Sequence, residues 1–261
     1  MPSLATTAII LNVESFIKKL LIYIPAHNCA DTIVGVIRGI PPEVSSIADI
    51  IVVDNSSSDG TQARLEEARE ANLLPLGLTV MRTSSNLGYA GSQKLAYKLA
   101  VSSPSVEWVI MLHGDGQYPS GLTALFLPFL ESPVSVCYGY RSKLKFREEE
   151  TPWLTWLTIK VLSLLESCVT GVFRKEWHTG FVMYRTSFLR KVALDKLTQT
   201  PHIDGNLLFV SGAMGLKTAA VPIYKRYKEL TPFEGAARRE YVLDVLRLMF
   251  EFRRNKREYI G

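Results

Sequence analysis

Short apolar runs alternate with amphipathic stretches along most of the chain. The runs LLIYIP at 20–25 and DIIVVD at 49–54 have continuously apolar interiors, which is typical of parallel strands buried on both faces. The same pattern predicts four further strands, at 78–81, 108–112, 134–139 and 217–223.

Helical periodicity fills the intervals between these strands. A helix is expected from about Asp31, whose carboxylate suits an N-cap, and a charged amphipathic helix over 61–72. Further helices are expected at 91–101, 121–130, 153–173, 186–194, 204–215 and 236–255. Strict alternation stops after 134–139, because no strand directly follows the helix at 153–173. The order of elements predicts one α/β domain around a mostly parallel sheet.

Composition fits a folded globular protein. The 261 residues are 47% hydrophobic and 21% charged, enough for one large α/β domain. Cys29, Cys137 and Cys168 have no CxxC spacing, which indicates reduced thiols in a cytoplasmic protein and neither a zinc site nor a disulfide framework. The apolar run at 5–13 is short and follows no basic segment, so we expect no secretory signal.

The net charge of +5 is concentrated near the C-terminus. Residues 224–261 contain ten Lys and Arg against six Asp and Glu, a net charge of +4. Such a segment favours phosphate-bearing partners or an anionic membrane surface, although a solvated helix face explains it equally well. A nucleic-acid partner is disfavoured, because these basic residues lack the interleaved aromatics of single-strand binders.

The apolar stretch at 153–173 is long enough to cross a membrane. It contains Lys160 and Glu166, each of which costs about 2.5–3.5 kcal/mol at a bilayer centre. We therefore expect a helix that lies on an apolar surface and does not span the bilayer. The last helix, at 236–255, also has an apolar stripe, which packing on the domain or burial in a homodimer would explain as well.

Polar side chains follow three of the predicted strands. PAHN follows the first, DNSSSDGT the second and HGDGQY the fourth. In open α/β sheets, ligands bind beyond the carboxyl ends of the strands. No GxGxxG follows the first strand and no GxxxxGK[ST] occurs, which removes the usual dinucleotide and P-loop cradles. A nucleotide would have to be held by loop side chains and a divalent cation.

The motif HGDGQY has the composition of a cation site. Asp115 and Gln117 are two residues apart, so on extended backbone both side chains point the same way and offer oxygen ligands to Mg²⁺ or Mn²⁺. Gly114 and Gly116 would leave room for a ligand near the backbone. His113 either ligates Mn²⁺, orients Asp115 or contacts the substrate, or it is a strand-end histidine bonded to backbone.

Taken together, the motifs resemble those of the family 2 glycosyltransferases of the GT-A fold, in the branch of dolichyl-phosphate mannose synthase. The matching segments occur in family order over about 20–228: IPAHNCADTI, IIVVDNSSSDGT, NLGYAGSQKLAY, MLHGDGQYPS, GYRSK, WHTGFVMYRTSFL and HIDGNLLFVSGAMGLKTAAVPIYKRY. Each segment alone is weakly specific, whereas the ordered set is strongly so.

The resemblance implies a function and a domain plan. It implies transfer of a sugar from a UDP- or GDP-sugar, with inversion and with Mg²⁺ or Mn²⁺ on the diphosphate. The expected acceptor is a polyprenyl phosphate at the cytoplasmic face of the membrane, in glycolipid or envelope polysaccharide synthesis. Residues 19–230 would be the catalytic domain, 1–18 an extension and 231–261 a basic amphipathic helix.

The resemblance also implies site residues. Pro25, Ala26 and His27 would border the base of the nucleotide, and Asp54 would hydrogen-bond it. The donor would also be contacted by Ser56, Gly88, His113 and Gly114. The metal would be bound by Asp115, Gln117 and His113. Catalysis would involve Asp115, Asp204, Arg141 and Arg226, with the two arginines near phosphate.

Three positions depart from the family pattern. His113 replaces the first carboxylate of the usual D-x-D, Cys29 replaces an acidic residue, and His27 replaces an aromatic one. The departures leave the identity of the donor open. They also motivate the alternative of a nucleotide-sugar-binding protein that has lost catalysis.

The acceptor half leaves two readings open. A phosphate acceptor needs little deprotonation, whereas the hydroxyl of a saccharide or soluble acceptor needs a general base, for which Asp204 is the candidate. Asp204 is equally well explained as the N-cap of the helix after it. His178 and Thr179 resemble the acceptor loop of the family, with a structural turn at Gly180 as the other explanation.

Overall fold

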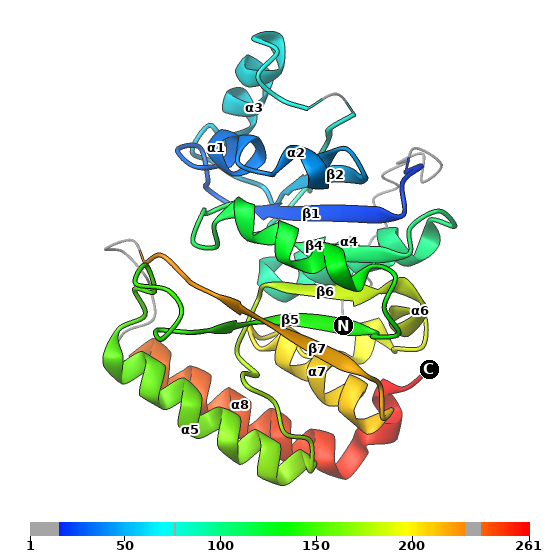
Figure 1. Cartoon of the computed structure of the whole chain (residues 1–261), viewed down its shortest axis with the longest axis vertical. Helices are drawn as coiled ribbons and strands as arrows, with labels where there is room; N and C mark the ends of the chain where they lie inside the picture. The colour runs from blue at the N-terminus through cyan, green and yellow to red at the C-terminus, as the bar shows by residue number, and fades with distance from the viewer. Residues whose placement is uncertain (1–15, 76, 228–235) are drawn as a thin grey trace.

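The computed structural model describes residues 16–75, 77–227 and 236–261 (Figure 1). A sheet with the strand order β3-β2-β1-β4-β6-β5-β7 forms the centre of this part of the chain. Its strands are β1 (Leu20–Ala26), β2 (Ala48–Asp54), β3 (Thr79–Arg82), β4 (Trp108–Met111), β5 (Val136–Arg141), β6 (Val182–Arg185) and β7 (Thr218–Ile223). The predicted α/β class is confirmed. Most of the extension predicted at 1–18, and the domain boundary predicted near 230, lie outside the described residues.

Helices cover both faces of the sheet (Figure 1). They are α1 (Ile33–Arg38), α2 (Pro42–Ser45), α3 (Thr61–Glu70), α4 (Gly88–Ser102), α5 (Trp153–Thr170), α6 (Thr186–Leu189), α7 (Ile203–Ala213) and α8 (Ala236–Asn255), with 3-10 turns η2 (Ser120–Phe129), η3 (Leu194–Lys196) and η4 (Lys256–Tyr259). Tyr23 of β1 belongs to a core that α4, α7 and α8 cover, whereas its neighbour Ile22 belongs to a core under α1, α3 and η2. Burial on both faces explains the continuous apolar runs of the central strands.

Strand β6 is the strand that the sequence pattern missed. It runs antiparallel to both of its neighbours, β4 and β5, in an otherwise parallel sheet. Its four residues carry no clear period, and it is reached from α5 by a long loop that gives no βα signal.

Several predicted boundaries were wrong. Helix α4 begins at Gly88 and not at 91, and α5 ends at Thr170 because Gly171 takes a left-handed φ of 72°. The helix predicted at 186–194 is a single turn followed by η3, and the one predicted at 121–130 is a 3-10 helix. Asp31 does not cap α1, whose N-cap is Thr32 without a side-chain cap bond.

Helices α5 and α8 lie side by side along one end of the molecule (Figure 1). Among the residues described, no helix combines the length and the apolar character needed to cross a bilayer.

Candidate active site

The polar strand ends meet at a topological switch point of the sheet. The chain continues from β1 to β2 and β3 on one side, and β4 lies on the other side of β1. A crevice at the carboxyl ends of such strands is the usual ligand site of this architecture. We name the cavity of about 300 Å³ found there the β1 cavity. The predicted donor-binding residues that line the β1 cavity are Pro25, Ala26, His27, Gly88, His113 and Gly114.

Two asparagines that the sequence analysis did not single out complete this wall. The Nδ1 atom of His27 lies 3.0 Å from the carbonyl oxygen of Asn55, and its Nε2 atom lies 3.3 Å from the amide nitrogen of Asn86. Asn55 donates in turn to Asn86 over 3.0 Å. Both asparagines line the β1 cavity. Their only signal in the sequence was their place in segments that resemble the family.

Asp54 and Ser56 are not among the residues that line the β1 cavity. The buried carboxylate of Asp54 accepts hydrogen bonds from Arg82, over 3.0 Å, and from the amide of Ser57, over 2.9 Å. Ser56 has a left-handed φ of 60°. The contacts of these two residues shape the loop after β2.

Gly114 lacks a side chain for a reason other than the predicted one. A Cβ atom at this position would lie 2.7 Å from the carbonyl oxygen of Pro25, to which the Gly114 amide also donates over 3.1 Å. The glycine therefore lets the loop after β4 pack directly on β1.

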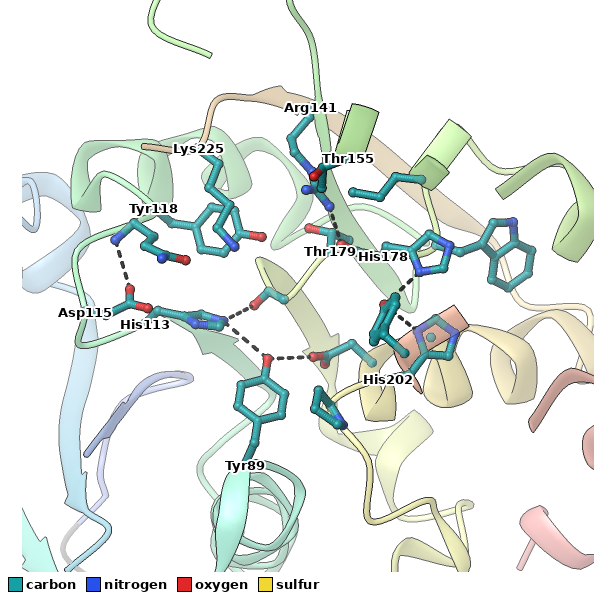
Figure 2. Close-up of a pocket in the computed structure, with 18 of the residues that line it drawn as sticks. Tyr89, His113, Asp115, Tyr118, Arg141, Thr155, His178, Thr179, His202 and Lys225 are labelled. Carbon is teal, nitrogen blue, oxygen red and sulfur yellow. Dashed lines mark hydrogen bonds between the residues drawn. The ribbon is translucent and has the colours of Figure 1, made fainter. Parts of the chain in front are cut away.

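Asp115 lies where two cavities meet. It lines the β1 cavity and also a second one of about 290 Å³, which we name the central cavity (Figure 2). Its Oδ1 atom accepts from the amide of Gln117 over 2.9 Å, and both side chains are half-buried. The oxygens of Asp115 and Gln117 suit a hard divalent cation. The exposed Arg226, whose amide donates to the Gln117 carbonyl over 2.8 Å, shares with these two residues a groove on the outer side of the loop.

His113 is bound to backbone at one ring nitrogen. Its Nε2 atom lies 3.2 Å from the carbonyl oxygen of Gly180, in the loop before β6. Burial lowers the pKa of His113, so the neutral ring donates its Nε2 proton to that carbonyl. If Nε2 bound a metal, its hydrogen bond to the Gly180 carbonyl would be lost. A Cβ atom on Gly180 would lie 2.6 Å from the same nitrogen, which explains the glycine.

Positive charge lines the central cavity opposite β4 (Figure 2). Arg141 is buried and pairs with Glu176 over 2.6 Å. Burial opposes its charge, but Glu176, together with Tyr118 and Tyr227, outweighs burial and raises the pKa of Arg141. Lys225 was not predicted. Burial, with a further contribution from Arg141, lowers the pKa of this half-buried lysine to about 8.

Asp204 lines the central cavity and is not a helix cap. The N-cap of α7 is His202, so the capping alternative is wrong. The Oδ1 atom accepts from the hydroxyls of Tyr97 and Tyr184 over 3.2 and 3.1 Å. Tyr89 and Gln93 donate to Oδ2, each over 3.4 Å. Burial raises the pKa of Asp204 to about 6, although these donors partly counteract it.

The loop before β6 brings His178 and Thr179 to the central cavity. The carbonyl oxygen of His178 accepts from Arg141 over 2.5 Å. His202 and Tyr241 also line this cavity and were missed, because α7 and α8 bring them there from distant parts of the chain.

Comparison with known proteins adds a family. The model of glycosyl transferase family 2 matches residues 21–198, which is more than half of the chain. No curated protein matches the chain.

Solved structures of glucosyl-3-phosphoglycerate synthase from Mycobacterium tuberculosis are similar in fold. The complex with UDP is 18% identical, with a TM-score of 0.64, over 89% of this chain and 80% of that chain. The complex with Mg²⁺ and UDP is 17% identical with a TM-score of 0.65, over the same shares. The complex with Mn²⁺, UDP-glucose and phosphoglyceric acid is 16% identical, with a TM-score of 0.60 and the same coverage. At these identities the likeness shows the fold, and it confirms the predicted GT-A architecture.

Proposed function

Because the chain belongs to glycosyl transferase family 2, we propose that it transfers a sugar from a UDP- or GDP-sugar to a lipid phosphate at a membrane surface. The place of Asp115, between the β1 cavity and the central cavity, carries the donor half of this proposal. A nucleoside in the β1 cavity would bring its diphosphate to Asp115 and its sugar into the central cavity. The mycobacterial structure that holds UDP-glucose with Mn²⁺ supports this class of donor.

Mg²⁺ or Mn²⁺ fits the oxygens of Asp115 and Gln117, with His113 able to contribute only its Nδ1 atom while Nε2 binds Gly180. Such an ion neutralises charge on the diphosphate of the donor. Lys225 lines the central cavity and Arg226 the outer groove, so both would add positive charge beside the leaving diphosphate. Arg141, which Glu176 already neutralises, would mainly position the acceptor loop through the His178 carbonyl.

Helix α5 supports a lipid acceptor. Its inner face contributes Thr155 and Ile159 to the wall of the central cavity. Its outer face exposes large apolar side chains, namely Trp153, Leu154, Leu157, Val161, Leu164 and Leu165. The adjacent helix α8 carries exposed basic residues, among them Arg253 and Arg254. A surface that is apolar along one helix and basic along the next is typical of proteins that bind anionic membranes peripherally.

The phosphate oxygen of the acceptor would attack the anomeric carbon from the face opposite the diphosphate, and the configuration would invert. One observation favours a second candidate, a hydroxyl acceptor. Asp204 is a carboxylate inside the central cavity, where it would take the hydroxyl proton.

A panel of UDP- and GDP-sugars, incubated with polyprenyl phosphate or with saccharides in the presence and absence of Mn²⁺, tests the proposal by mass spectrometry of the products. We expect glycosylated polyprenyl phosphate only when Mn²⁺ is present. Asp204→Asn should leave this transfer within about tenfold of wild type, since a phosphate needs no base. A loss of about 10²-fold or more with a saccharide acceptor would favour the second candidate. No product from any pair would favour the inactive binding protein.

The membrane surface is tested by sedimentation with vesicles of phosphatidylglycerol and phosphatidylcholine. The double variant W153E/L164E should lose vesicle binding, because both side chains are more than half exposed on the outer face of α5. Leu73→Glu, at a 45% exposed leucine outside this face, is the matched control and should bind as wild type does. A change of oligomeric mass without a change in vesicle binding would show that the face is a homodimer interface and contradict the proposal.

A further inference from the structure

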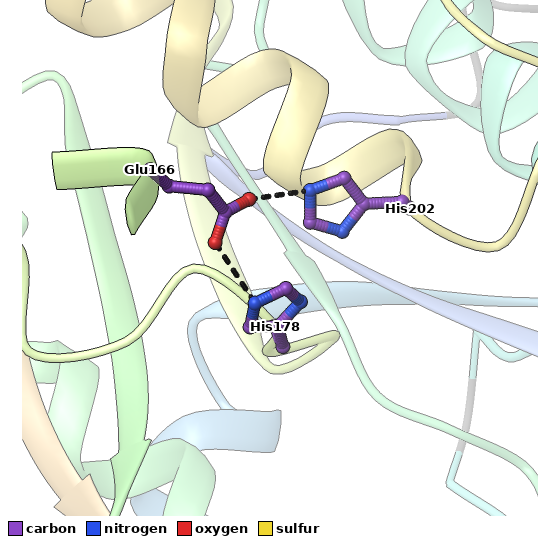
Figure 3. A group of neighbouring side chains, drawn as sticks. All are labelled: Glu166, His178 and His202. Carbon is purple, nitrogen blue, oxygen red and sulfur yellow. Dashed lines mark hydrogen bonds and ion pairs between the residues drawn. The ribbon is translucent and has the colours of Figure 1, made fainter. Parts of the chain in front are cut away.

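Three side chains from separate elements converge on one another next to the central cavity (Figure 3). They are Glu166 of α5, His178 of the loop before β6 and His202 at the start of α7, and we name them the His–Glu–His cluster. Their side chains are at most 2% exposed. The Nε2 atom of His178 lies 2.8 Å from one carboxylate oxygen, and that of His202 lies 2.9 Å from the other. All three ligand atoms lie within 4.8 Å of one another.

The other nitrogen of each ring meets the same hydroxyl. The Oη atom of Tyr241, on α8, lies 2.8 Å from Nδ1 of His178 and 3.1 Å from Nδ1 of His202. A phenol has one proton, so it donates to at most one of these nitrogens, whatever else it contacts. At least one Nδ1 atom must therefore carry a proton and donate to Tyr241.

This count leaves the Nε2 atom of at least one ring without a proton. A neutral imidazole that is protonated on Nδ1 has a lone pair on Nε2, and here that lone pair would face an oxygen of Glu166. The hydrogen-bond geometry points to the same missing proton. His178 Nε2 and Glu166 Oε2 lack a hydrogen-bond partner among the described residues, although they are fully buried and only 2.8 Å apart. A positive charge between them would resolve the conflict, supplied either by an extra proton or by a metal ion.

We propose that the His–Glu–His cluster is a mononuclear Zn²⁺ site. Two imidazole nitrogens and one carboxylate oxygen are a ligand set that Zn²⁺ takes when a fourth position stays open. A tetrahedral ion about 2.0–2.1 Å from each ligand needs ligand atoms roughly 3.3 Å apart. The two contacts with Glu166 would therefore open by a few tenths of an ångström, and the longest separation among the three ligand atoms, which is at most 4.8 Å, would close by up to about 1.5 Å. Tyr241 supplies the outer hydrogen bonds that orient metal-binding histidines.

The proposed ion would be separate from the cation on the donor. In Figure 2 the two histidines lie across the central cavity from Asp115 and His113. Since His178 and His202 both line this cavity, the ion would lie just behind its wall, and a small shift of either ring would open its fourth position to the cavity. An anionic oxygen of the acceptor is the ligand that fits there, and this last step alone rests on the proposed function.

The test uses the full chain, stripped of metal with a chelator and then dialysed against Zn²⁺ or Co²⁺ alone. Metal content by mass spectrometry should show one tightly held Zn²⁺ per chain. Glu166→Gln and His202→Asn should lose it, whereas Asp115→Asn and His27→Asn should keep it. The Co²⁺ form should show the visible absorption of a tetrahedral site.

His202→Cys keeps the test decisive if removal of a ligand prevents folding. A cysteine thiolate still ligates the metal, so its Co²⁺ form should gain a sulfur-to-cobalt charge-transfer band in the near ultraviolet. The proposal would be overturned if the wild-type protein folds but holds no Zn²⁺ after the dialysis. It would also be overturned if only Asp115→Asn loses the Zn²⁺, or if His202→Cys binds Co²⁺ without the new band. Because no donor sugar is present, these results do not depend on whether the chain transfers sugar.

Discussion

The two sides of the central cavity are built by different means. On the side of β1 and β4, backbone and uncharged side chains form most of the wall. His27, which is held by Asn55 and Asn86, is an example. On the side of α5, α7 and α8, ionisable groups are buried against one another, as in the pair Arg141–Glu176 and the His–Glu–His cluster. The first side can be recognised as short segments of sequence. On the second side, segments of sequence point to Arg141, His178 and Asp204, but their partners come together only through folding. The buried charges there make this side sensitive to single substitutions.

The largest effect is expected at the junction of the two sides. Asp115→Asn removes the charged oxygen offered to the cation and should lower kcat/KM by about 10³-fold, as loss of a group that stabilises transition-state charge does. Steady-state transfer assays with Mn²⁺ measure it. Asp195→Asn is the matched control, since Asp195 is an exposed partner of Lys98 outside both cavities, and it should act as wild type. Equal activity of the two variants would refute the role of Asp115.

The buried ion pair beside the central cavity should contribute more to stability than an exposed pair at the amino ends of β1 and β4. Glu176→Gln leaves Arg141 buried without its partner and should lower the free energy of unfolding by roughly 3–5 kcal/mol. Glu107→Gln breaks the pair with Lys19, whose side chains are 70% and 45% exposed, and should cost less than about 1 kcal/mol. Denaturant unfolding compares the two variants. Similar losses would mean that burial does not set the contribution of these pairs.

Lys225 predicts a pH dependence. Its pKa of about 8 lies below its ordinary value of 10.5, so the ammonium is present below pH 8 and is lost as the pH rises through 8. Transfer should therefore fall by about tenfold above pH 8 if this charge assists the leaving diphosphate. Lys225→Met should be slow and without this step, whereas Lys225→Arg should keep its rate to higher pH. A pH–rate profile of kcat shared by all three proteins would contradict the assignment.

The smallest effect is expected where the two sides touch. Gly180→Ala would bring a Cβ atom to 2.6 Å from Nε2 of His113 and displace that ring. We expect a loss of less than about tenfold in kcat with little loss of stability, because a small shift at the edge of the cavity suffices. Gly35→Ala, where a new Cβ meets nothing within 4 Å, is the control. A larger loss in the control than in Gly180→Ala would rule out the contact with His113 as the cause.

Sequence reasoning predicted the first side better than the second for a physical reason. Parallel strands buried on both faces have apolar runs that end abruptly. The sequence pattern therefore identifies residues such as Pro25 and Asp115 as lying at strand ends. Strand β6 has four residues and no such signature, and without it the loop at 178–180 could not be placed beside His113.

Long-range pairing accounts for the remaining misses. Glu166 was predicted as a charge that keeps a helix out of the bilayer, whereas it lies under the cavity between two histidines. Asp54, which was predicted to contact a base, accepts a hydrogen bond from Arg82 on β3, a partner that its own strand does not indicate. Local patterns give the place of a side chain along its own element and not the partner that folding brings to it.

The reversed direction of β6 has a consequence for how this architecture can diversify. The parallel strands β1 and β4 reach the ligand edge of the sheet at their exits, whereas β6 reaches that edge at its entrance. The chain before β6 can therefore lengthen or shorten without shifting the register of the strands that hold Pro25 and Asp115. Substrate preference on one wall could change in this way while the opposite wall stays intact.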